Sequence, residues 1–88
     1  PLSFELKQNF PNPFNPETAI QFALPEASKV SLKIFNITGQ TVEVLTDGYM
    51  NAGYHSVVWN AETLPSGVYF YSLEAEGFSA VKKCVLIK

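Results

Sequence analysis

Val30-Ser31-Leu32-Lys33-Ile34 alternates apolar and polar residues one by one, which is the period of a β-strand with one buried face. The same period of two recurs along the chain, at residues 42–44, 55–59 and 69–74. No stretch of ten or more residues has the spacing of an amphipathic helix. The sequence therefore predicts an all-β protein.

Turn-forming residues separate the alternating segments at short intervals. Pro11-Asn12-Pro13 and Asn15-Pro16 predict a stiff loop, because proline fixes its own φ and restrains the residue before it. Further turns are expected at residues 25–28, 38–40, 47–48, 52–53, 65–67 and 76–77. The strands are then expected near residues 3–8, 18–24, 29–37, 41–46, 54–60, 67–75 and 78–87. Seven short strands indicate an immunoglobulin- or fibronectin-like antiparallel β-sandwich, a single domain over residues 1–88.

Two of the expected strands are apolar on both faces. Tyr69 and Tyr71 lie on one side of residues 67–75 and Phe70 on the other, while residues 84–87 are apolar throughout. Such a strand is either central in its sheet or covered by something outside the domain. The first interpretation is favoured for both strands.

Composition and charge exclude several classes of protein. Of the 88 residues, 47% are hydrophobic and 16% charged, which is too apolar for a disordered tail. The net charge is −2 and the chain has no arginine, so a nucleic-acid binder is not expected. No apolar run is long enough to span a membrane, and residues 1–5 lack the pattern of a signal peptide, so any export signal is expected on sequence outside this stretch.

Catalytic and metal-binding side chains are sparse. The only cysteine, Cys84, lies in an apolar strand where a thiol is usually inert, and the only histidine, His55, is expected at a sheet margin with a backbone carbonyl as its partner. The eight acidic residues are scattered and form no calcium-binding loop. We therefore expect no enzyme, no metal site and no cofactor.

Aromatic residues leave a binding function open. Trp59, Tyr69 and Tyr71 are expected in the core, as is common in β-sandwiches. Tyr49 and Tyr54 flank an expected loop and are candidates for stacking on a sugar.

The last seven residues are unusual because they contain Lys82, Lys83 and Lys88 around an apolar run. Lysines protect hydrophobic edge strands against aggregation, and an accessible edge with basic ends is also a surface that a receptor could bind.

Five collinear segments resemble the type A C-terminal sorting domain of the type IX secretion system. They are residues 9–18 (NFPNPFNPET), 30–40 (VSLKIFNITGQ), 53–60 (GYHSVVWN), 66–71 (SGVYFY) and 82–88 (KKCVLIK). Each segment alone is a weak signal, but five in the right order over nearly the whole chain are specific.

This resemblance implies a non-catalytic signal at the C-terminus of a cargo protein, and the cargo could be a hydrolase. Such cargo reaches the periplasm and is directed through an outer-membrane translocon. A sortase-like protease then usually removes the domain, and the cargo ends on the cell surface or is released. Carried over by residue, the recognition elements are Pro11, Asn12, Pro13, Gly67, Tyr69, Lys83, Val85, Ile87 and Lys88.

Two other functions share this kind of fold. One is an accessory spacer or carbohydrate-binding module of a secreted glycoside hydrolase, which needs exposed coplanar aromatics. The other is a structural assembly module of the flagellar-cap type, which needs a patterned interface for self-association.

Overall fold

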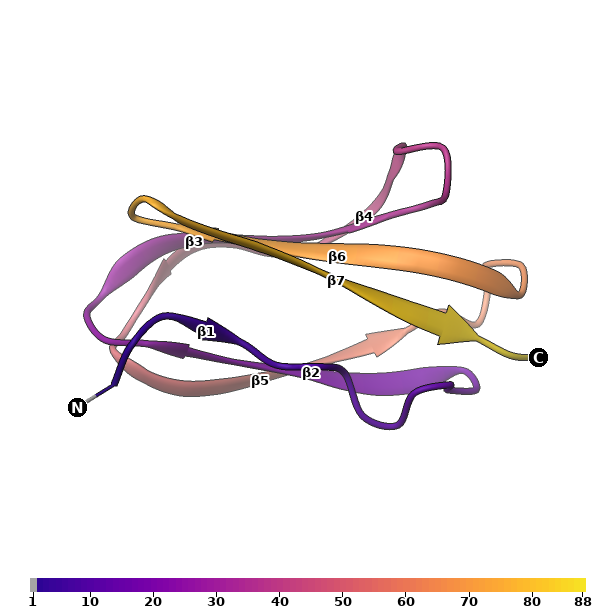
Figure 1. The fold of residues 1–88 in the computed structure, drawn as a ribbon, viewed down its shortest axis with the longest axis horizontal. Coiled ribbons are helices and arrows are strands. Elements are labelled where there is room, and N and C mark those ends of the chain that lie inside the picture. The colour runs from indigo at the N-terminus through magenta and orange to yellow at the C-terminus, as the bar shows by residue number, and fades with distance from the viewer. Residues whose placement is uncertain (1) are drawn as a thin grey trace.

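Residues 2–88 are described by a computed structural model, in which seven β-strands form two antiparallel sheets. In order across the three-stranded sheet lie β1 (Glu5–Leu6), β2 (Glu17–Leu24) and β5 (Gly53–Asn60). Across the four-stranded sheet lie β4 (Thr41–Met50), β3 (Ser28–Phe35), β6 (Gly67–Ala75) and β7 (Phe78–Leu86). Figure 1 shows the two sheets edge-on, one above the other. The prediction of a seven-stranded all-β sandwich is confirmed.

The core lies between the sheets and is built from alternate residues of the strands. Val30, Leu32 and Ile34 are fully buried, as their alternation predicted. Trp59 and Tyr71 are the largest fully buried side chains, which confirms that they belong to the core. Burial of such a side chain stabilises the fold by roughly 2–3 kcal/mol. Large aromatics therefore supply much of the stability of this small domain.

β4 is longer than the sequence predicted. The turn expected at Asp47-Gly48 is wrong, because β4 continues to Met50 and Gly48 pairs with Val30 of β3. Gly48 has a φ of 152°, a conformation that glycine adopts at low cost. A glycine inside a strand and a glycine in a turn look alike in the sequence.

β6 and β7 resolve the question of the strands with two apolar faces. β6 lies between β3 and β7, so the central position favoured for residues 67–75 is confirmed. β7 is an edge strand, so the central position favoured for residues 84–87 is wrong. Cys84 and Leu86 face the core, whereas Val85 is half-buried and Ile87 is 51% exposed.

The opening segment changes sheets. It pairs with β2 at Glu5–Leu6, where the N–H of Lys7 also donates to the carbonyl of Gln21, and again at Phe10, which bridges to Ala19. It then crosses to the other sheet, where Phe14 forms a parallel bridge with Leu86. The strand expected at residues 3–8 is therefore shorter than predicted, because the chain is already leaving β2.

Candidate recognition site

Residues 8–14, called the strap below, run from the edge of β2, where Phe10 bridges to Ala19, to the outer edge of β7, where Phe14 bridges to Leu86. The backbone N–H of Phe14 donates to the carbonyl of Val85 at 3.0 Å, and the N–H of Ile87 donates to the carbonyl of Phe14 at 2.9 Å. The Oδ1 of Asn12 accepts from the N–H of Val85 at 3.0 Å. The end of the terminal strand is thus paired on both sides, with β6 and with the strap.

Gln8 extends this cover towards the middle of β7. Its Nε2 donates to the carbonyl of Lys83 and to the Oδ1 of Asn9, both at 2.7 Å. The outward backbone groups between Lys83 and Ile87 therefore bond to the strap. This part of β7 offers few free backbone groups to an incoming strand.

A buried polar cluster fixes the strap. Asn9 donates through Nδ2 to Thr18 Oγ1 at 3.0 Å and to the carbonyl of Pro11 at 3.2 Å, and Thr18 donates to the same carbonyl at 2.8 Å. From the opposite sheet, the Tyr71 hydroxyl accepts from the N–H of Asn9 and donates to the carbonyl of Lys7, both at 2.7 Å. Buried polar groups that are fully paired hold one geometry. Among residues 2–88 no buried side-chain nitrogen or oxygen lacks a partner.

Aromatic packing anchors the far end of the strap. Phe14 is 2% exposed, and its ring lies 5.2 Å from that of Trp59. The indole of Trp59 meets Tyr69 edge-on at 5.8 Å, and the Tyr69 hydroxyl donates to the carbonyl of Pro65 at 2.7 Å. Three of the sequence segments quoted above therefore meet in one aromatic row. Tilted and edge-on ring pairs such as these are favoured geometries.

The C-terminal residue folds back on the loop between β5 and β6. The backbone N–H of Lys88 donates to Ser66 Oγ at 3.1 Å. Its ammonium group donates to the carbonyls of Leu64, at 2.9 Å, and Glu62. A charged donor that bridges two carbonyls ties this loop to the end of β7.

The structure brings the predicted recognition residues together at one end of the sandwich. Figure 1 shows the C-terminus there, opposite the N-terminus. The strap contacts Val85, Gly67 begins β6 opposite Leu86, and Lys88 contacts the neighbouring loop. The exposed members of the set are Pro11, Asn12, Pro13, Gly67, Lys83, Ile87 and Lys88. Tyr69 is buried, so it supports this surface without being part of it.

The residues that hold the strap in place were not predicted from the sequence. Asn9, Phe14, Thr18 and Tyr71 make its key contacts, and three of them lie in the first sequence segment. The signal that could have found them is an asparagine, a phenylalanine and a threonine in a proline-rich loop. A phenylalanine in such a loop indicates that part of the loop packs against the core, and a nearby asparagine and threonine can then pair with each other.

Tyr49 and Tyr54 are 76% and 73% exposed. Tyr49 pairs with the exposed Lys29 on the outer face of the four-stranded sheet, and Tyr54 pairs with Ala23 on the outer face of the other sheet. Directly opposed residues share a face, so the two rings lie on opposite sides of the sandwich. One flat sugar cannot stack on both.

Cys84 and His55 lie in different sheets. Cys84 is fully buried, and burial raises the pKa of its thiol to about 12. His55 stacks on Phe22 at 5.3 Å, and its Nε2 lies 2.8 Å from the carbonyl of Asn51, to which it donates. The expected backbone partner of His55 is confirmed. A thiol that stays neutral and a separate histidine do not form a catalytic pair.

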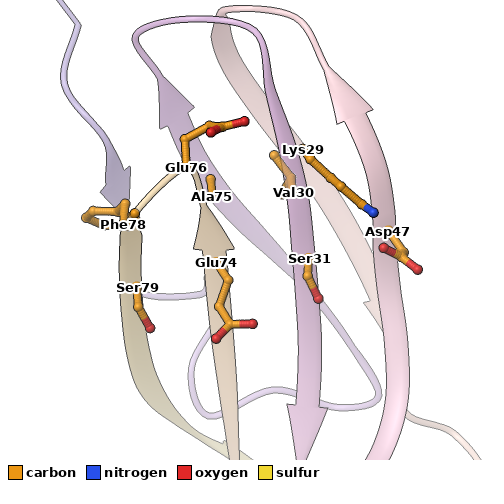
Figure 2. A pocket seen from close by; sticks show the side chains of 10 residues that line it. Lys29, Val30, Ser31, Asp47, Glu74, Ala75, Glu76, Phe78 and Ser79 are labelled. Atoms are coloured by element: carbon orange, nitrogen blue, oxygen red, sulfur yellow. The ribbon is translucent and has the colours of Figure 1, made fainter.

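An open groove of about 520 Å³ lies on the outer face of the four-stranded sheet, at the end opposite the C-terminus. Figure 2 shows Asp47, Ser31, Glu74 and Ser79 in a row across its four strands, with Lys29 beside Asp47. Within the described part of the chain, no three His, Cys, Asp or Glu side chains are placed to hold a metal ion. Likewise, no helix in residues 2–88 could cross a bilayer.

The sequence was also compared with known proteins. The profile of the secretion system C-terminal sorting domain matches residues 8–88. The chain belongs to this family. No curated protein matches it significantly. The match begins at the first residue of the strap and runs through Lys88, so it spans the whole site described above.

The sorting domain directs cargo into type IX secretion, and its family is non-catalytic. Its role implies contact with the secretion machinery and passage across the outer membrane. The resemblance seen in the sequence is therefore confirmed at the level of family and function.

Proposed function

We propose that the secretion machinery recognises this sorting domain as a folded unit, through the surface that the strap and the end of β7 form together. The observation that carries the proposal is the hydrogen bond between Asn12 and Val85, which are 73 residues apart. A surface built from both ends of the chain exists only after folding. An unfolded tail would present each half alone.

The physical basis is preorganisation. The strap is held by proline residues, by the buried polar cluster and by Phe14, so it loses little conformational entropy when a partner docks. The exposed apolar side chain of Ile87 and the charges of Lys83 and Lys88 give the surface an apolar centre with basic ends. The partner we propose is the outer-membrane translocon, with an apolar patch bordered by carboxylates.

The remaining partners follow from the same proposal. A cargo domain, which could be a hydrolase, precedes the sorting domain in the full protein. After translocation, a sortase-like protease separates the two outside the β-sandwich. The cargo is then attached to the cell surface or released.

The experiment is secretion of a reporter cargo fused to this domain. Deletion of residues 85–88 is expected to leave the cargo folded and active in the periplasm. Because this deletion also removes the contacts of the strap, the point variants Ile87→Ser and Lys88→Ala are needed. Both are expected to reduce secretion severalfold. The control Tyr49→Ser, at an exposed position of β4 outside the proposed surface, is expected to leave secretion unchanged. Normal surface display of the deletion variant would refute the proposal.

A further inference from the structure

β5 has an exposed edge whose properties are independent of the proposed function. β5 is the edge strand of the three-stranded sheet on the side away from β1. The backbone N–H and C=O of Ala19 in β2 both bond to Phe10, at 2.9 and 3.0 Å. These two groups therefore point away from Val58, the residue opposite Ala19 in β5. Backbone direction alternates along a strand, and Ala61 bonds inward to Pro16 at 2.9 Å. The N–H and C=O groups of Tyr54, Ser56 and Val58 therefore point outward.

This edge carries none of the usual protection. Tyr54, Ser56 and Val58 are all exposed, and β5 contains no lysine, arginine, aspartate or glutamate. No backbone hydrogen bond of the described residues reaches the outer side of β5. By contrast, β4 has two irregularities in its pairing with β3, and β7 has lysines and the strap. Bulges, charges and covering segments are the devices that normally prevent edge pairing.

We propose that β5 is a self-association edge, at which a second copy of this chain adds antiparallel to form one continuous six-stranded sheet from the two three-stranded ones. A two-fold axis at Ser56 places Ser56 opposite its own copy and Tyr54 opposite Val58 of the second copy. In this register the outward backbone groups of each opposed pair exchange two hydrogen bonds. Each Tyr54–Val58 contact joins an aromatic and a β-branched side chain, a favourable cross-strand pair.

The surrounding face supports the same register. Phe10, Ala19 and Val58 lie in one row across the outer face of the sheet, and Phe10 and Val58 are 80% and 63% exposed. Tyr54 of the second copy, followed by its Ala23, would continue this row across the joint. β5 itself carries no lysine, arginine, aspartate or glutamate that would repel the same strand of its own copy. Since edge pairing buries little area, we expect a weak dimer, with a dissociation constant of roughly 0.01–1 mM.

Sedimentation of the 88-residue chain over this concentration range tests the proposal. The chain is expected to dimerise with increasing concentration. Val58→Pro removes an outward N–H without breaking a bond to β2, so it should weaken the dimer at least tenfold and leave the thermal midpoint nearly unchanged. Val58→Thr keeps the N–H and serves as the matched control, with dimerisation retained. A wild-type chain that stays monomeric at about 1 mM, or a dimer that Val58→Pro does not weaken, would overturn the proposal.

A charge pair tests the register. Ser56→Lys or Ser56→Asp places two like charges directly opposite each other across the two-fold axis, so each variant alone should be monomeric. An equimolar mixture of the two should dimerise again, because the opposed charges then attract. Failure of the mixture to associate would exclude pairing centred on Ser56.

Discussion

β7 and β5 are both edge strands, but only β7 is covered. Along the edge of β7, the outward groups from the carbonyl of Lys83 to the N–H of Ile87 bond to the strap, while those of Tyr54, Ser56 and Val58 in β5 face solvent. β7 carries the C-terminal end of a secretion signal, and an open edge there could pair with any exposed strand. The difference teaches that in this chain residues 8–14 cover and position the end of β7.

The largest expected loss of stability comes from a variant that frees the strap from the core. Phe14→Ala removes its buried anchor against Trp59 and should lower the free energy of unfolding by about 3–5 kcal/mol. Chemical denaturation measures the change. The matched control is Phe10→Ala in the same segment, which is 80% exposed and should change stability by less than about 0.5 kcal/mol. Equal losses for the two variants would mean that Phe14 is not an anchor.

Alkaline pH should loosen the strap side of the molecule. Burial raises the pKa of Cys84, which points from β7 into the core, and that of Tyr71, which holds the strap, each to about 12. The unfolded chain loses these protons near pH 9 and 10, whereas the folded chain keeps them. Stability is therefore complete below about pH 9 and falls between pH 9 and 12. Urea midpoints at pH 8 and pH 11 measure this loss of stability. The loss should be smaller in Cys84→Ala. A wild-type midpoint that is the same at both pH values would contradict the prediction.

Proline at matching positions compares the two edges directly. Val85→Pro deletes the N–H that donates to Asn12 and should cost about 1–3 kcal/mol. Val58→Pro deletes an N–H that has no partner inside the sheet and should cost less than about 1 kcal/mol. Thermal unfolding of both variants at low protein concentration checks the difference. A larger loss at Val58 would reverse the assignment of open and closed edges.

The smallest expected effect comes from one side-chain hydrogen bond of the strap. Asn12→Ala should cost about 0.5–1.5 kcal/mol and speed tryptic cleavage after Lys82 and Lys83. Asn15→Ala, at an exposed position of the same loop, is the control and should leave the cleavage rate unchanged. Equal cleavage of the wild-type chain and Asn12→Ala would show that the strap does not protect β7.

The fold could be predicted well from the sequence because most strands are marked by local patterns of apolar and polar residues. Alternation placed Val30, Leu32 and Ile34 in the core, and the family resemblance led to the correct function. Gly48 was misread because a glycine inside a strand and one in a turn have the same local signature.

The candidate site was only partly predictable. Its residues could be named by resemblance, but their arrangement depends on contacts between distant parts of the chain. Neither the bond from Asn12 to Val85 nor the position of β7 at the edge has a local signal in the sequence. The strap that pairs with the outer edge of residues 84–87 comes from the other end of the chain. The sequence around these residues therefore could not show that β7 is an edge strand.

Amide hydrogen exchange measures the difference between the two edges most directly. At a protein concentration too low for association, the amides of Val85 and Ile87 should exchange slowly, because they donate to Asn12 and Phe14. The amides of Tyr54 and Val58 should exchange many times faster. Fast exchange at Val85 and Ile87, at the rate of the β5 amides, would contradict a terminal strand that is closed by the strap.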